Sequence, residues 1–137
     1  MDRVAIIILN YKKWLDTIEC LKSIKNIDYK NYDLYIVDNN SMNQSLSKIN
    51  EWLLDNWNTD SKKIDKNVIE HRCNDNKICL IQSSINNGYS AGNNIGIRYS
   101  LKGNCKFILV LNPDTVVTED FLKPMVTFLK KMIMLEW

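Results

Sequence analysis

Apolar and polar residues follow one another along the chain in blocks that predict strands and helices in turn. Residues 4–9 form a continuous run of apolar, mostly branched side chains, a pattern typical of a strand buried on both faces of a parallel sheet. Three further runs have the character of strands: 33–37, 77–82 and 106–111. Apolar residues recur at helical spacing in the segments between them: 14–24, 46–57 and 90–102. This alternation predicts an α/β fold with a mostly parallel, doubly wound sheet and helices on both faces.

Residues at the expected helix boundaries have the chemistry of caps. Ser45 and Thr118 are expected to cap the helices that follow them, and Gly103 is expected to end the helix over residues 90–102. The last helix, from Glu119 onward, is unusually apolar. It therefore needs a cover, which is either a partner chain, as in a homo-oligomer, or a continuation of the chain.

Residues 58–76 are charged and aperiodic, which predicts a surface excursion with at most a short irregular helix. Deleting this excursion should barely affect the core. His71, the only histidine, lies within it and is expected on the surface. The four cysteines lack the spacing of a zinc site, so we expect reduced, idle thiols, with a Cys73–Cys79 disulfide as the alternative.

The composition excludes several classes of function but does not identify one. The chain has 137 residues with 45% hydrophobic and 25% charged residues, as expected for one globular domain over residues 1–137. A net charge of only +2, without a concentration of Lys and Arg, gives no reason to expect a nucleic-acid partner. The longest apolar runs are too short to span a membrane and do not resemble a signal peptide, which predicts a cytoplasmic protein.

The segments that follow the four predicted strands carry small or polar side chains. They are Asn10-Tyr11, residues 38–41, residues 83–88 and residues 112–114. The carboxyl ends of parallel strands meet at one edge of the sheet, where open α/β folds bind ligands. The pattern predicts a polar ligand site there, although the same residue types also form turns.

Two features of these segments are more specific. Three of the four glycines lie within residues 88–96, in a spacing that matches neither the dinucleotide fingerprint nor a phosphate loop. Gly96 serves either close helix–sheet packing or a ligand, whereas Gly88 suits a turn or the approach of a ligand to the backbone. Asp114 follows Pro113 at the sheet edge, where it is either a turn former or a ligand for a divalent cation shared with phosphate oxygens.

Four motifs carry a resemblance to a known family: residues 4–11, 36–41, 86–96 and 109–115. In order and spacing they resemble the nucleotide-binding half of family 2 glycosyltransferases with the GT-A fold, and within it the rhamnosyltransferase-like branch. The resemblance covers residues 4 to about 128. It implies the Rossmann-like half of a GT-A fold, truncated before the half that binds the acceptor.

The resemblance also implies a reaction. A nucleotide-diphosphate sugar, carrying uridine or thymidine, would bind with Mn²⁺ or Mg²⁺, and the sugar would pass with inversion to a hydroxyl of a saccharide or lipid-linked acceptor. Such reactions serve cell-surface polysaccharide synthesis, which would place the protein in the cytoplasm or at the inner face of the membrane. The family's general base lies in a later segment, which we expect this chain to lack. The alternative is a nucleotide-binding or assembly module without transferase activity.

Roles in the resemblance pass to matching residues of this chain. Tyr11 would lie against a pyrimidine ring, and either Asp38 or Asn39 would accept the ring N–H. The other residues expected to bind the nucleotide sugar are Asn10, Asn86, Gly88, Gly92, Asn93 and Asn112. Asp114 would bind the metal. The chain departs from the usual pattern at Asn39 and Asn112, where many members carry an acid.

Overall fold

The secondary structure alternates as expected over residues 1–57 and 59–136, the part that the computed structural model describes. In chain order its elements are β1 (Val4–Asn10), α1 (Trp14–Lys25), β2 (Tyr32–Asp38), α2 (Ser45–Asn56), β3 (Asp60–Asp65), β4 (Val68–Cys73), β5 (Asn76–Gln82), α3 (Tyr89–Ser100), β6 (Phe107–Leu111) and α4 (Leu122–Glu136). All four predicted strands and the three helices between them are present. Their boundaries differ from the predicted ones by one or two residues at most ends.

The strands form one mixed sheet in the order β3-β4-β5-β2-β1-β6. β1 pairs in parallel with both β2 and β6, and β2 pairs in parallel with β5. Every residue of β1 and of β2 is buried, because helices cover both faces of these strands. The predicted α/β class with a mostly parallel sheet is confirmed.

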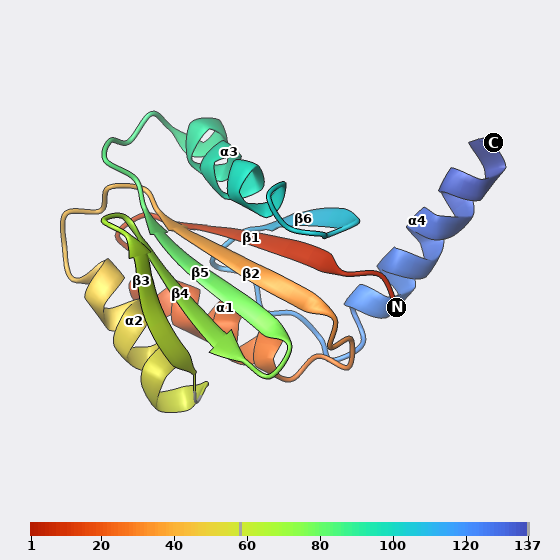
Figure 1. The fold of residues 1–137 in the computed structure, drawn as a ribbon, viewed down its shortest axis with the longest axis horizontal. Coiled ribbons are helices and arrows are strands. Elements are labelled where there is room, and N and C mark those ends of the chain that lie inside the picture. The colour runs from red at the N-terminus through yellow and green to blue at the C-terminus, as the bar shows by residue number, and fades with distance from the viewer. Residues whose placement is uncertain (58, 137) are drawn as a thin grey trace.

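Helices lie on both sides of the sheet (Figure 1). α1 and α2 pack on one face, over a core that includes Ile6, Ile8 and Leu34. α3 packs on the other face, over Ile7, Tyr35 and Val37. A Cβ atom on Gly96 of α3 would come within 2.6 Å of Ile7 Cγ2, so this glycine serves close packing of the helix on the sheet.

The prediction of a surface excursion over residues 58–76 is wrong. β3 and β4 form an antiparallel hairpin, and β4 extends the sheet by pairing antiparallel with β5. Val68 is buried, and His71, expected on the surface, is 0% exposed. The Nδ1 atom of His71 lies 2.7 Å from Thr59 Oγ1, and Nε2 lies 2.8 Å from Asn50 Oδ1 of α2. Deleting this segment would therefore open the core. Asn58 lies outside the described residues.

The predicted caps are also wrong. Ser45 is the first residue of α2 instead of its cap: the N-cap is Gln44, whose side chain makes no capping hydrogen bond, and the Ser45 N–H donates to Asn43 Oδ1 at 2.8 Å. α4 begins at Leu122 instead of Glu119, and the Thr118 hydroxyl donates to Asp120 Oδ1 in the preceding turn. Gly103 lies beyond the C-cap Leu101 and does not adopt the left-handed conformation of a glycine cap.

α4 leaves the body of the molecule near the amino-terminal ends of the strands (Figure 1). Leu122 and Val126 pack on the core, but several apolar side chains are exposed: Met125, Phe128, Leu129, Met132, Ile133 and Met134. Trp137, part of the predicted apolar end, lies outside the described residues.

None of the helices in the described ranges combines the length and apolar character that crossing a bilayer requires. All four cysteines are free thiols, so Cys73 and Cys79 do not form the alternative disulfide.

Candidate functional site

The candidate site lies where the direction of chain travel across the sheet reverses. From β1 the chain moves to β2 and later to β5, and it then returns through α3 to β6 on the other side of β1. Such a reversal leaves a crevice at the carboxyl ends of the strands, where loops diverge and ligands bind. The loops after β1, β2, β5 and β6 all lie at this edge.

Asn10 and Asp38 form the buried base of the site. Asn10 Nδ2 donates to Asp38 Oδ1 at 2.9 Å, and its Oδ1 accepts from Thr17 Oγ1 of α1 at 2.6 Å. The Asp38 carboxylate also accepts from the hydroxyl of Ser41 at 2.5 Å and from its backbone N–H at 3.2 Å. Since the amide of Asn10 and both carboxylate oxygens of Asp38 are engaged within the protein, these two residues hold the loops that carry the exposed groups.

Asn39 differs from Asp38 because one of its polar atoms has no partner. Its Nδ2 donates to Asn86 Oδ1 at 3.0 Å and to the Gly88 carbonyl at 3.3 Å. Its Oδ1 is buried and accepts no hydrogen bond, although the residue is only 3% exposed. A buried acceptor without a partner is costly by about 1–3 kcal/mol, which makes this oxygen a candidate contact for a ligand donor.

The loop after β5 is held close to Asn39 by its own polar groups. Asn86 Oδ1 accepts the N–H of Gly88 at 2.8 Å as well as the amide of Asn39. Gly88 has φ of 94° and ψ of −179°, a conformation that is essentially restricted to glycine. Gly92 leaves no room for a side chain, since a Cβ atom would lie 2.6 Å from Leu9 Cδ1 and 3.2 Å from Asn39 Cγ.

A second unpartnered amide belongs to Asn93 of α3. The residue is 5% exposed, and neither its Oδ1 nor its Nδ2 has a hydrogen-bond partner. A cavity of about 370 Å³ opens between α3 and the loop after β5, and Asn39 and Gly92 contribute to its lining. Ligand pockets commonly have volumes of roughly 300–1,000 Å³, so this cavity has room for part of a nucleotide.

Tyr11, directly after β1, is the aromatic group of the site. It is 43% exposed, and Lys12 Nζ lies 5.2 Å from the centre of its ring. An exposed ring at the sheet edge, with a cation beside it, can stack against a planar base.

The loop after β6 contributes Asn112 and Asp114. Asn112 Oδ1 accepts a hydrogen bond of 2.7 Å from the hydroxyl of Tyr89, the first residue of α3. Asp114 is exposed. It lies close enough to Cys20 for its charge to act on that thiol: burial, and after it the Asp114 carboxylate, raises the pKa of Cys20 to about 12.

The donor set around Asp114 suits a shared metal site rather than a closed one. Within residues 1–57 and 59–136, no group of three or more His, Cys, Asp or Glu side chains could hold a metal ion. One carboxylate fits a hard cation such as Mg²⁺ or Mn²⁺ if phosphate oxygens and water complete the shell, which is how proteins often bind Mg²⁺.

Besides Asn10, Tyr11 and Asp38 at the ends of β1 and β2, the sequence-predicted site residues lie at the same edge in two groups. Asn39, Asn86, Gly88, Gly92 and Asn93 lie between β2, the loop after β5 and α3, whereas Asn112 and Asp114 lie at the end of β6. Tyr89, which links the groups, was not predicted. Its position directly after Gly88 within the glycine-rich motif was the available signal.

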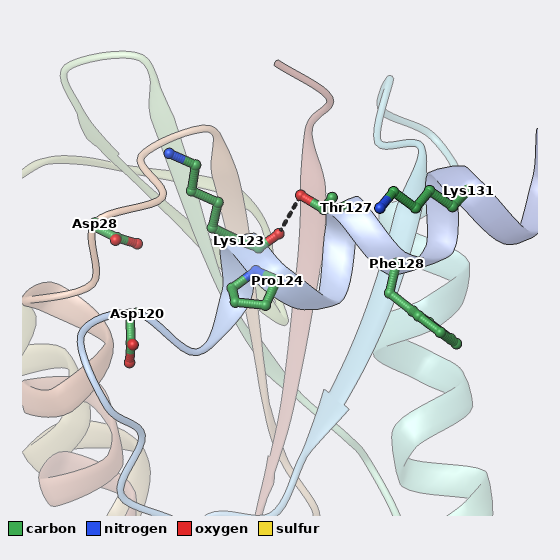
Figure 2. Close-up of a pocket in the computed structure, with 7 residues that line it drawn as sticks. All are labelled: Asp28, Asp120, Lys123, Pro124, Thr127, Phe128 and Lys131. Atoms are coloured by element: carbon green, nitrogen blue, oxygen red, sulfur yellow. Dashed lines mark hydrogen bonds between the residues drawn. The ribbon is translucent and has the colours of Figure 1, made fainter.

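A larger cavity, of about 460 Å³, lies away from this edge and contains none of these residues (Figure 2). Figure 2 shows it between α4, which contributes Lys123, Thr127 and Phe128, and two loops that contribute Asp28 and Asp120. It is an open hollow beside the projecting helix. The crevice at the carboxyl edge is the better candidate because polar groups from four strand ends converge there.

Comparison with known proteins gives a consistent picture. The model of the family described as glycosyl transferase family 2 matches residues 5–132. The chain is 31% identical over 128 residues to the low-salt glycan biosynthesis hexosyltransferase Agl10 of Haloferax volcanii, a match that covers 93% of this chain and 33% of that protein. The chain therefore spans about one third of the length of this relative.

Solved structures share the fold. TarS residues 1–349 of S. aureus superimposes with a TM-score of 0.68 at 17% identity, over 94% of this chain and 32% of that one. The same region has been solved with UDP-GlcNAc. The mannosyltransferase PcManGT of Pyrobaculum calidifontis, in complex with GDP-Man and Mn²⁺, gives a TM-score of 0.63 at 16% identity, over 82% of this chain and 28% of that one.

Proposed function

The chain belongs to glycosyl transferase family 2, and from this premise we propose that it binds the nucleotide-diphosphate part of a sugar donor at the carboxyl edge of β1. The observation that carries the proposal is the buried, unpartnered Oδ1 of Asn39. The unpartnered amide of Asn93 and the cavity of about 370 Å³ beside α3 support it.

Asn39 selects the base in this proposal. Its free Oδ1 can only accept, and uracil and thymine each carry a ring N–H at N3, whereas cytosine has none there. Asp38 is less suited to the same task, because both of its carboxylate oxygens already accept hydrogen bonds within the protein. The exposed ring of Tyr11 would lie against the base. Uridine and thymidine donors are therefore favoured over cytidine donors.

The diphosphate would lie toward the end of β6. Gly88 leaves backbone free of a side chain along this path, Gly92 lets α3 lie close to Asn39, and the amide of Asn93 can bond to the ribose or to the diphosphate. Asp114 would hold the divalent cation together with diphosphate oxygens. When bound, such a cation neutralises charge that develops on the leaving diphosphate.

The rest of the reaction is proposed by family. Agl10 is named a hexosyltransferase, and TarS and PcManGT have been solved with UDP-GlcNAc and with GDP-Man and Mn²⁺, which supports transfer of a hexose from a nucleotide donor. We place the acceptor among saccharides and lipid-linked saccharides of the cell surface, at the inner face of the membrane, with inversion at the anomeric carbon. A rhamnosyl donor is the narrower form of the proposal.

A second candidate is a nucleotide-binding or assembly module without transferase activity. The exposed apolar side chains of α4 favour it, because they offer a surface on which another chain could pack. Sugar transfer from a UDP- or dTDP-sugar by the purified chain would exclude this candidate.

Calorimetric titration of the 137-residue chain with UDP, dTDP and CDP, each with and without Mn²⁺, tests the proposal. We expect UDP and dTDP to bind about tenfold more tightly than CDP, the equivalent of one hydrogen bond of about 1.4 kcal/mol. Asp114→Ala should abolish the part of the affinity that depends on Mn²⁺. Asp55→Ala, which removes an exposed carboxylate near the C-terminal end of α2, is the matched control. A folded chain that binds none of the nucleotides would overturn the proposal.

A further inference from the structure

Tyr89 joins the two groups of site residues. It is the first residue of α3, and its hydroxyl donates to Asn112 Oδ1 at the end of β6 over a distance of 2.7 Å. The preceding Gly88 carbonyl accepts from Asn39, whose free oxygen is the proposed contact of the base. A short chain of contacts, from Asn39 through Gly88 and Tyr89 to Asn112, therefore connects the ends of β2 and β6 and passes β1, which lies between those strands.

The hydrogen bond from Tyr89 occupies one end of the Asn112 amide. An asparagine amide has an acceptor, Oδ1, and a donor group, Nδ2, with two N–H bonds. In this arrangement Oδ1 accepts from Tyr89 and Nδ2 is the free end, whereas a turned amide would donate an N–H to the tyrosine oxygen and leave Oδ1 free; a diphosphate oxygen, which is an acceptor, favours the first arrangement. Nδ2 makes no hydrogen bond to the rest of the described chain, and Asn112 is exposed, so both of its N–H bonds remain available to a ligand.

We propose that Tyr89 is a positioning residue of the donor site, which holds Asn112 so that its Nδ2 donates to a diphosphate oxygen of the bound nucleotide. The inference rests on the proposed function and extends it to two residues. It explains how an amide serves where many family members have an acid. A diphosphate oxygen is an acceptor, so an N–H donor attracts it directly, whereas a carboxylate at the same place repels it unless a cation intervenes.

A double-mutant cycle on UDP binding, measured by calorimetry with Mn²⁺ present, tests this inference. We expect Tyr89→Phe to weaken UDP binding by roughly three- to tenfold, the usual range for one hydrogen bond. Asn112→Ala should weaken it at least as much. If Tyr89 acts through Asn112, adding Tyr89→Phe to the Asn112→Ala variant should cause no further loss.

Two further variants sharpen the test. Tyr99→Phe removes a hydroxyl that bonds to Asp65 at the other end of α3, and it should leave UDP binding unchanged. Asn112→Asp keeps an acceptor for Tyr89 but has no N–H, so without metal its UDP affinity should fall at least as far as that of Asn112→Ala. All three positions are at least partly exposed, and thermal melting checks that each variant folds.

The outcomes separate the two proposals. No UDP binding by the wild-type chain would overturn both. If Tyr89→Phe does not change UDP affinity, only the role of Tyr89 is overturned. The same holds if Tyr89→Phe lowers UDP affinity by the same factor in the Asn112→Ala variant as in the wild type. Asn112→Asp that binds UDP like the wild type in the absence of metal would show that Nδ2 does not contact the diphosphate.

Discussion

Asn10 and Asp38 face each other across the ends of β1 and β2, joined by a hydrogen bond of 2.9 Å from Nδ2 to Oδ1. The two residues are also partners in the parallel register of these strands. The pair lies beneath the loops that carry Tyr11 and Asn39. Ser41 holds the loop after β2 in place, because its hydroxyl and its backbone N–H both donate to the Asp38 carboxylate. The buried carboxylate therefore connects the register of the sheet with the positions of the residues proposed to contact the base.

Asp38→Ala should lower the free energy of unfolding by about 3–6 kcal/mol. The substitution leaves the buried Nδ2 of Asn10 and the hydroxyl of Ser41 without their carboxylate partner, and hydrogen bonds to charged groups contribute about 1.5–3 kcal/mol each. Urea unfolding at neutral pH measures the change. Asp38→Asn, which keeps one acceptor, should lose less, and equal stability of the alanine variant and the wild type would contradict this account.

Gly92→Ala and Gly96→Ala should separate binding from stability. At Gly96 the new methyl meets Ile7 Cγ2 at 2.6 Å and Val37 Cγ2 at 3.2 Å, branches attached to rigid β-carbons, so we expect a loss of about 1–3 kcal/mol. At Gly92 it meets the flexible end of Leu9 and the amide of Asn39, so stability should fall less and UDP affinity more. Paired unfolding and titration measurements check this; the opposite ranking would show that Gly92 belongs to the core alone.

The stability of the chain should fall as the pH drops below about 6.5. Burial lowers the pKa of His71, so the unfolded chain takes up a proton over a pH range in which the folded chain does not. Each pH unit below the ordinary histidine pKa of about 6.5 then reduces the free energy of unfolding by at most about 1.4 kcal/mol. The loss stops once the pH is below the lowered pKa of His71 in the folded chain. Urea unfolding at pH 7.0 and 5.5 measures it. His71→Gln, which cannot titrate, should be less stable but should lack this dependence. A wild-type chain that is no less stable at pH 5.5 would contradict the assignment.

Sequence patterns predicted the central part of the fold because burial on both faces leaves a strong signal. β1 is apolar along almost its whole length, as a strand between two helical layers must be. The β3–β4 hairpin was missed because its signal is mixed: β3 is exposed throughout, and in β4 the buried Val68 and His71 stand among polar residues that are only partly covered. The available local signal was the two-residue turn Asn74-Asp75 between β4 and β5, in which Asn74 has a φ of 55°.

The candidate site was predictable in place but not in detail. The rule that loops converge at the carboxyl edge located eight of the ten candidate residues there, because it depends only on the order of strands and helices, whereas Gly92 and Asn93 came from the family resemblance. Which polar atoms remain free depends on side-chain contacts between distant segments. Asp38 and Asn39 are neighbours with similar side chains, yet only Asn39 keeps an unpartnered oxygen. The bond between Tyr89 and Asn112 depends likewise on how α3 is set against β6.

Asn39→Asp should weaken UDP binding, although many family members carry an acid at this position. In this chain Asn39 Nδ2 donates to Asn86 Oδ1 and to the Gly88 carbonyl, and a carboxylate would place its oxygens against both of these acceptors. Asn86 cannot turn its amide toward the new carboxylate without giving up the N–H of Gly88. We therefore expect a loss of about tenfold in UDP affinity, together with faster amide hydrogen exchange at Gly88. Asn104→Asp, an exposed asparagine beyond the far end of α3, controls for the added charge. Tighter UDP binding by Asn39→Asp, with unchanged exchange at Gly88, would mean that the loop after β5 does not depend on the Asn39 amide.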